Sequence, residues 1–79
     1  MTVFLRAGGN LRAMIKPDVD YYTRKVEIEG GKTIGEILEH ISLNPAFVAL
    51  MYVDGAMKNL SYKPADGQTV TLQPPVSGG

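Results

Sequence analysis

The stretch Thr33-Ile34-Gly35-Glu36-Ile37-Leu38-Glu39-His40-Ile41 carries the strongest structural signal in the sequence. Thr33 and Glu36 have the spacing of a capping box, in which the two side chains satisfy backbone N–H groups at the start of a helix. Asn44-Pro45 follows, and the residue before a proline avoids helical backbone angles. We therefore expect a helix that begins after Thr33 and is closed by Asn44-Pro45. Its apolar side chains recur with helical spacing on one face: Ile34, Ile37, Leu38 and Ile41.

Strand patterns lie on both sides of this helix. Residues 22–28 and 69–73 alternate between apolar and polar side chains, which is typical of half-buried strands. Residues 47–53 form a continuous apolar run, which favours a strand covered on both faces. Asp54-Gly55 after that run indicates a two-residue hairpin turn, and Pro64-Ala65-Asp66-Gly67 indicates a second turn. Residues 2–5 are a short β-rich start, residues 6–10 favour a turn, and residues 11–15 fit either one helical turn or a short strand.

The order of these elements predicts an α+β fold, a small mixed sheet covered by one main helix. Neither the helix nor the sheet can bury its apolar side alone. A chain of 79 residues allows a single domain. We expect this domain to span residues 1–73, followed by an extended tail over residues 74–79.

Composition excludes several classes of function. Eight basic residues balance eight acidic ones, which argues against non-specific nucleic-acid binding. The chain has no cysteine and hence no disulfide, thiolate metal site or cysteine nucleophile. No apolar run approaches a membrane span, and residues 1–5 do not form a signal peptide. We expect a cytoplasmic protein that binds neither nucleic acid nor membrane.

Three possible sites have simpler explanations. His40 is the single histidine and falls on the polar face of the helix, without a partner for a metal site. Gly30-Gly31-Lys32-Thr33 resembles the end of a phosphate-binding loop, but Val26 stands where that loop needs a glycine. A tight turn before the helix explains it better. The tyrosines, which without a basic stripe favour core and sheet packing over base stacking, are Tyr21, Tyr22, Tyr52 and Tyr62.

The last six residues, Pro74-Pro75-Val76-Ser77-Gly78-Gly79, are the most informative functional feature. Two prolines favour extended backbone and end a strand, because they cannot donate to its ladder. The seven residues after Leu72 span about 23 Å when fully extended. Gly78 and Gly79 have no side chain, so this tip fits a narrow pocket where any Cβ would clash. A frayed end or a cloning remnant are the alternatives.

A carboxylate at such a tip becomes reactive only when it is activated, for example as an acyl-adenylate. The sequence shows no nucleotide site, so a partner would have to supply the activation. Binding would use the tail together with the polar face of the strand before it, which carries Thr69, Thr71 and Gln73.

Asp66-Gly67, an alternating strand and Pro-Pro-Val-Ser-Gly-Gly together resemble the end of the ubiquitin-like sulfur carriers. The small sulfur-carrier subunit of molybdopterin synthase resembles it most, and the capped helix also resembles the thiamine sulfur carrier. The resemblance covers roughly the last 47 residues well and the first 32 by element order only.

This resemblance implies a β-grasp fold, and a ubiquitin-activating-type adenylyltransferase that uses ATP to adenylate Gly79. Sulfur then replaces an oxygen to give a thiocarboxylate. The tail would enter the catalytic subunit of molybdopterin synthase, or an equivalent acceptor, and donate sulfur to a pterin precursor. By position Gly79 bears the sulfur, Gly78 is its slim neighbour, and Pro74, Pro75 and Val76 guide the tail, with Ser77 also in the bound segment. The chain would bind no cofactor or metal itself and would not be a complete enzyme.

Two other functions remain open. An activated Gly79 could also be attacked by a lysine amine, as in a ubiquitin-like protein modifier. The chain could instead be a plain β-grasp interaction module whose tail is incidental.

Overall fold

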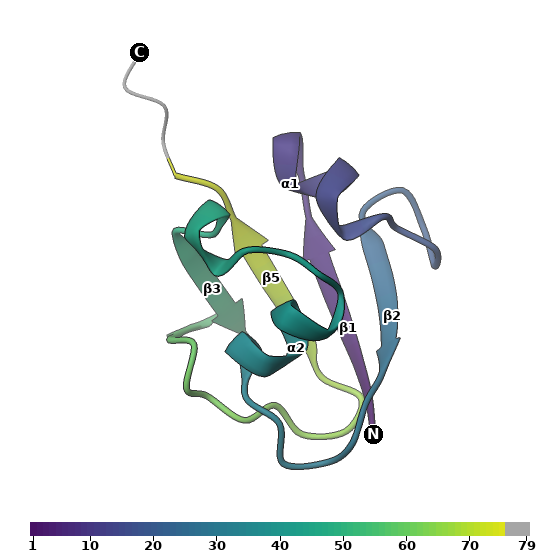
Figure 1. Ribbon diagram of the computed structural model, residues 1–79, viewed down its shortest axis with the longest axis vertical. Helices are drawn as coiled ribbons and strands as arrows, with labels where there is room; N and C mark the ends of the chain where they lie inside the picture. The colour runs from purple at the N-terminus through teal and green to yellow at the C-terminus, as the bar shows by residue number, and fades with distance from the viewer. Residues whose placement is uncertain (76–79) are drawn as a thin grey trace.

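The structure is a computed structural model that describes residues 1–75. Within these residues a five-stranded sheet has the order β2-β1-β5-β3-β4 (Figure 1). The elements follow one another as β1 (Thr2–Ala7), α1 (Gly9–Ile15), β2 (Thr23–Glu27), α2 (Ile34–His40), a 3-10 helix (Pro45–Phe47), β3 (Leu50–Val53), β4 (Ala56–Lys58) and β5 (Thr69–Gln73). The predicted α+β class, with a mixed sheet, is confirmed.

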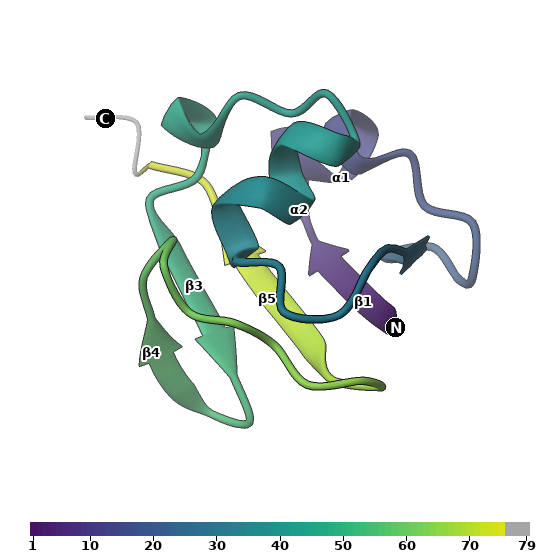
Figure 2. The same ribbon diagram turned by 60° about the horizontal axis from the view of Figure 1, so that its bottom comes forward.

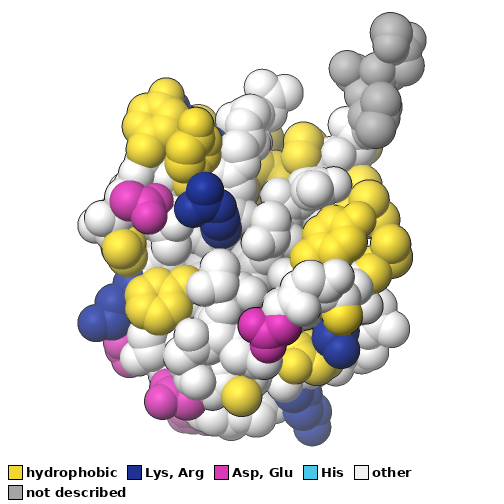
Figure 3. Space-filling model, turned by 180° about the vertical axis from the view of Figure 1, so that it is seen from behind, with side chains coloured by type: hydrophobic (Ala, Val, Ile, Leu, Met, Phe, Trp, Pro, Cys, Tyr) yellow, Lys and Arg dark blue, Asp and Glu magenta, His cyan; other side chains and the backbone are white. Residues whose placement is uncertain are grey.

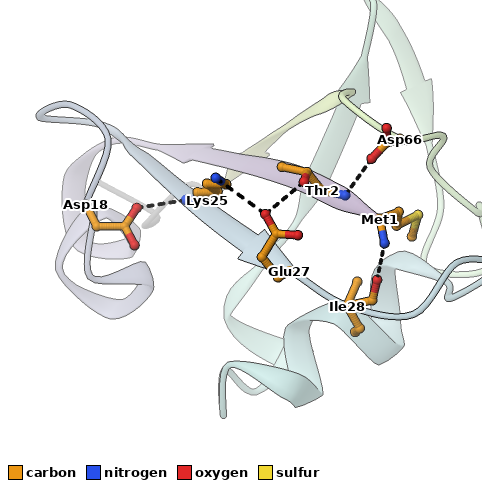
Figure 4. A network of polar contacts seen from close by, with 7 residues as sticks. All are labelled: Met1, Thr2, Asp18, Lys25, Glu27, Ile28 and Asp66. Atoms are coloured by element: carbon orange, nitrogen blue, oxygen red, sulfur yellow. Dashed lines mark hydrogen bonds and ion pairs between the residues drawn. The ribbon is translucent and has the colours of Figure 1, made fainter.

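The centre of the sheet is the parallel pair β1 and β5, and the other pairs are antiparallel. Polar contacts hold the start of β1 in place (Figure 4). The backbone N–H of Thr2 donates to Asp66 at 2.6 Å, and its hydroxyl donates to Glu27 at 2.8 Å. The ammonium group of Met1 donates to the carbonyl oxygen of Ile28 at 2.6 Å. Because β1 and β5 run the same way, the chain leaves β5 at the end of the sheet where α1 begins (Figure 1).

The core lies between one face of the sheet and the helices, which both cover that face (Figure 2). Leu11 and Ile15 anchor α1 there. The buried cluster also contains side chains from β1, β3, β5 and α2. Within residues 1–75, the opposite face of the sheet carries no helix (Figure 2). The largest side chains of the core with essentially no exposed surface are Leu5, Leu11, Ile15, Ile34, Ile37, Leu38 and Leu72.

Two local predictions are confirmed in detail. The Glu36 backbone N–H donates to the Thr33 hydroxyl at 3.1 Å, and the Thr33 backbone N–H donates to the Glu36 carboxylate at 2.9 Å, which completes the capping box. Asp54 and Gly55 have φ values of 52° and 79°. Two successive positive φ values match a type I′ turn, whose twist suits a two-residue hairpin.

The first part of the chain corrects two expectations. Residues 6 and 7 belong to β1 rather than to a turn, and residues 9–15 form a helix. The pattern of residues 11–15 was too short to separate a helical turn from a strand, and burial of Leu11 and Ile15 decides it. Helix α1 has seven residues, as has α2, so the sheet is covered by two helices rather than by one main helix.

The segment after α2 corrects two more. The helix ends at His40, because Ser42 adopts a left-handed φ of 60°. Asn44 caps the following 3-10 helix instead of closing α2, accepting from the Ala46 backbone N–H at 2.9 Å. Strand β3 begins only at Leu50, which is 37 % exposed. The expectation that residues 47–53 form a strand covered on both faces is therefore wrong.

Candidate functional site

The tail leaves from the middle of the sheet, because β5 lies between β1 and β3. The last pairing contact of β5 is the backbone N–H of Ala49, which donates to the carbonyl oxygen of Gln73 at 2.8 Å. Pro74 follows and has no N–H to continue the ladder. The prediction that the prolines end the last strand is confirmed. Both Pro74 and Pro75 are exposed.

Strand β5 turns the three predicted binding residues away from the helices. Val70 and Leu72 are buried in the core, so Thr69, Thr71 and Gln73 lie on the open face of the sheet. The structure thus brings the predicted strand residues and the base of the tail together. The predictions for Val76, Ser77, Gly78 and Gly79 concern residues outside the range that the structure describes.

The open face has an apolar side next to β5. Tyr52 of β3 lies opposite Thr71, and Leu50 lies opposite Gln73. Met57 of β4 lies opposite Tyr52 and is 62 % exposed. Hydrophobic side chains gather on this half of the face, at the right of Figure 3. A partner that takes up the tail would therefore find a mixed apolar and hydroxyl-bearing surface beside it.

The loop before β5 is held by the side chain of Gln68. Its Oε1 accepts from the Tyr62 hydroxyl at 3.1 Å and from the Ala65 backbone N–H at 2.8 Å. Its Nε2 donates to Asp54 at 3.0 Å. These contacts join the β3–β4 hairpin to the start of β5, so the strand that carries the tail begins from a fixed point.

A hollow of about 390 Å³ lies at the base of the tail, lined among others by Arg6, Tyr22, Thr71, Gln73 and Pro74. A larger hollow of about 600 Å³ lies beside α2 and shares no lining residue with it. The larger one is lined mainly by charged and polar side chains, including His40 and Glu36. Across residues 1–75, no group of histidine, aspartate and glutamate side chains has the geometry to hold a metal ion.

The segment before α2 forms a tight turn, as the sequence predicted. Gly31 has a φ of 83°, Thr33 caps the helix, and Lys32 lies 3.8 Å from Glu36 as an ion pair. His40 is exposed at the end of α2, as expected. No helix in the part of the chain that the structure describes is long and apolar enough to span a membrane.

Sequence reasoning missed one group of residues near the tail. Tyr21 and Tyr22 were expected in core and sheet packing, but they are 64 % and 42 % exposed. Arg6 lies over the ring of Tyr22 and Arg12 over the ring of Tyr21. These basic side chains come from β1 and α1, so no basic stripe is visible beside the tyrosines in the sequence.

Comparison with known proteins agrees with this geometry. The family model described as the ThiS family matches residues 18–79. A search of curated proteins found no match.

Solved structures share the fold. SAMP1 from Haloferax volcanii matches with a TM-score of 0.73 and 22 % identity, covering 100 % of both chains. A second crystal structure, of H. volcanii small archaeal modifier protein 1, matches with a TM-score of 0.70 and 18 % identity, covering 95 % of this chain and 98 % of the other. A complex of subunits 1 and 2 of molybdopterin-converting factor from Helicobacter pylori matches with a TM-score of 0.53 and 21 % identity, covering 100 % of both chains.

The family model covers most of the chain, and the likenesses to solved structures extend over its whole length. Together they confirm the β-grasp fold that the resemblance implied. The chain belongs to the ThiS family of ubiquitin-like sulfur carriers.

Proposed function

We propose that this chain carries sulfur on the carboxylate of Gly79 and donates it in molybdopterin biosynthesis. The observation that carries the proposal is the way the chain leaves the domain. The central strand β5 ends at Gln73, and the sequence Pro-Pro-Val-Ser-Gly-Gly follows at the end of the sheet where α1 begins. A slim tail on a rigid base suits insertion into a partner's active site.

Loading of the sulfur takes two steps, and both occur in a partner enzyme. The Gly79 carboxylate attacks the α-phosphorus of ATP in a ubiquitin-activating-type adenylyltransferase, and pyrophosphate leaves. A sulfide equivalent then attacks the carbonyl carbon of the acyl-adenylate and displaces AMP, leaving a thiocarboxylate. The chain contributes the tail and a docking surface and uses no cofactor of its own. The acceptor is the catalytic subunit of molybdopterin synthase or an equivalent protein.

The docking surface in this proposal is the open face of β5 with the tail base. Thr69, Thr71 and Gln73 lie on one uncovered face beside Tyr52 and Leu50. Amide shift mapping with the activating enzyme is expected to report on these residues. Shifts confined to residues 6–20 would refute this surface as the main contact.

Intact mass of the protein purified from its own host tests the central step, with the C-terminal peptide sequenced by fragmentation. We expect a gain of one sulfur for one oxygen, located on Gly79. The matched control lacks Gly79 alone and is expected to fold normally and acquire no sulfur. A shortened chain that still acquires sulfur would overturn the proposal.

The same preparation separates the second candidate, a ubiquitin-like protein modifier. The likeness in fold to small archaeal modifier protein 1 makes this candidate worth testing. Peptides of other proteins branched at lysine through Gly79, with Gly79 itself free of sulfur, would favour the modifier.

The acceptor pathway needs a separate assay. Thiocarboxylated protein is mixed with a pterin precursor and the host's synthase catalytic subunit, or with the thiazole-forming components of thiamine synthesis. We expect sulfur transfer to the pterin. Transfer only to the thiazole would move the protein to the thiamine pathway, which is the alternative that the family model also admits.

A further inference from the structure

Four side chains form a compact surface group where β1 ends and β2 begins. The rings of Tyr21 and Tyr22 meet edge to face, with centroids 4.9 Å apart and an interplanar angle of 87°. The Arg6 Cζ lies 5.2 Å from the Tyr22 centroid, and the Arg12 Cζ lies 4.1 Å from the Tyr21 centroid. Hydrophobic and basic side chains lie side by side at the upper left of Figure 3, on the open face. We call Arg6, Arg12, Tyr21 and Tyr22 the arginine–tyrosine corner.

Stacking orients the two guanidinium groups without using their hydrogen-bond donors. A guanidinium held over an aromatic face keeps its N–H edge available for a carboxylate. Among residues 1–75 the ion pairs are Lys25–Glu27 and Lys32–Glu36, neither of which involves the corner. Within that same range, the arginine side chain that donates a hydrogen bond is Arg24. Within residues 1–75, Arg6 and Arg12 therefore make no side-chain hydrogen bond and no ion pair.

The nearby acidic side chains are engaged in local backbone structure. Asp20 accepts from the Tyr22 backbone N–H at 2.9 Å, which is the main cause of its lowered pKa, with the Thr23 hydroxyl and the charge of Arg6 contributing. Asp18 accepts from the Lys25 backbone N–H at 2.8 Å. Asp20 offsets part of the charge of Arg6, so the corner offers a carboxylate unused guanidinium donors rather than a large excess of positive charge.

The corner has the composition of an interface centre and continues to the tail. Tyrosine and arginine are enriched among the residues that dominate binding energy at interfaces. Arg6 lies opposite Thr71 in the β1–β5 register. Arg6 and Tyr22 also line the same hollow as Gln73 and Pro74. A protein bound at the base of the tail would therefore also contact the corner.

We propose that the arginine–tyrosine corner binds an acidic segment of the protein that takes up the tail, with carboxylates on the edges of Arg6 and Arg12. The identity of that partner rests on the proposed function, whereas the acid-binding property of the corner does not. A protein segment fits better than a nucleic acid, because guanidinium groups already cover the tyrosine faces on which bases would stack.

The test titrates the full ¹⁵N-labelled chain with a hexaglutamate peptide and follows its amide shifts. We expect shifts centred on the corner, weakened by added salt, and none with hexaglutamine. Arg6→Gln/Arg12→Gln is expected to weaken binding by roughly tenfold or more, because a charged hydrogen-bonded pair is lost at each site. Lys32→Gln/Lys63→Gln removes the same charge elsewhere and is expected to bind as the parent does.

Two outcomes would overturn the proposal. One is equal weakening by both double variants, which would mean non-specific attraction to positive charge. The other is an oligothymidine probe that shifts the corner at lower concentration than hexaglutamate, which would indicate a nucleic-acid surface. Should the double variant fail to fold by circular dichroism, Arg12→Gln alone serves, because Arg12 is a half-exposed helix side chain.

A kinetic assay separates failure of this inference from failure of the proposed function. Gly79 adenylation is followed by pyrophosphate release with the activating enzyme. We expect the arginine double variant to raise KM for the carrier with kcat unchanged. If the parent chain is adenylated and the variant has the same KM, the corner is not a docking site for that enzyme. If the parent is not adenylated at all, the proposed function fails while the peptide titration still decides the corner.

Discussion

At the scale of single residues, Glu36 is the carboxylate with the best-defined role in stability. It accepts from the backbone N–H of Thr33 at 2.9 Å and from its hydroxyl at 3.1 Å, and Lys32 lies 3.8 Å away. The Thr33 backbone N–H is the main cause of the lowered pKa of Glu36. A carboxyl whose pKa is lowered in the folded state stabilises the fold at pH values above its ordinary pKa of 4.5. That contribution is lost as the pH falls through the folded-state value.

We therefore expect Glu36→Gln to lower the melting temperature near pH 7, with the difference from the parent shrinking as the pH falls below 4.5 and through the folded-state pKa. Glutamine keeps the geometry of the capping box and removes the charge. Thermal unfolding followed by circular dichroism across this pH range measures the difference. Asp20, whose pKa is also lowered, is present in both proteins, so its contribution cancels in the difference between them. Glu39→Gln, on the same helix outside the cap, is the control, and an equal pH response in that variant would contradict the assignment.

At the scale of elements, helix α1 contributes two buried side chains to the core. Leu11 and Ile15 are 1 % and 0 % exposed, whereas Met14 on the same helix is 38 % exposed. Leu11→Ala is expected to lower the free energy of unfolding by about 2–5 kcal/mol, because it leaves a cavity. Met14→Ala is expected to cost much less. Urea unfolding measures the free energy of unfolding of both variants. Similar losses would mean that Leu11 contributes no more to the core than the exposed Met14.

The β3–β4 hairpin and the loop before β5 depend on each other through Gln68. Gln68→Ala removes contacts to Tyr62, Ala65 and Asp54 at once. We expect a loss of about 1–3 kcal/mol, since two donors and one acceptor lose their partner. Chemical denaturation gives the value. Gln73→Ala is the matched control because Gln73 is exposed on the open face. If the control loses as much stability, the Gln68 contacts contribute little.

At the scale of the whole molecule, the proposed function divides folding and sulfur delivery between different parts of the chain. Every buried apolar residue of the described range lies at or before Leu72. Removal of residues 74–79 is therefore expected to leave the free energy of unfolding unchanged and to abolish adenylation. Denaturant unfolding and pyrophosphate release test the two halves of this prediction. A large loss of stability in the shortened chain would mean that the tail packs on the domain.

The local features of this protein were predictable from sequence because short-range chemistry determines them. The capping box of Thr33 and Glu36, the Asp54-Gly55 turn and the end of β5 before Pro74 each depend on a few neighbouring residues. The family was recognisable from the tail for the same reason. The start of the chain was not, because residues 11–15 are compatible with more than one local structure.

The sequence by itself determined the α+β class, the capped helix and the hairpin turn, and it contains the Pro-Pro-Val-Ser-Gly-Gly motif from which the family was recognised. Tertiary structure alone decided the helical state of α1, the early end of α2 and the open face of β3. It also placed Arg6 and Arg12 on Tyr22 and Tyr21, across 16 and 9 positions of sequence. Such contacts follow from the antiparallel pairing of β1 with β2 and from burial of Leu11 and Ile15. They are set by the packing of distant segments, which periodicity along the chain does not encode.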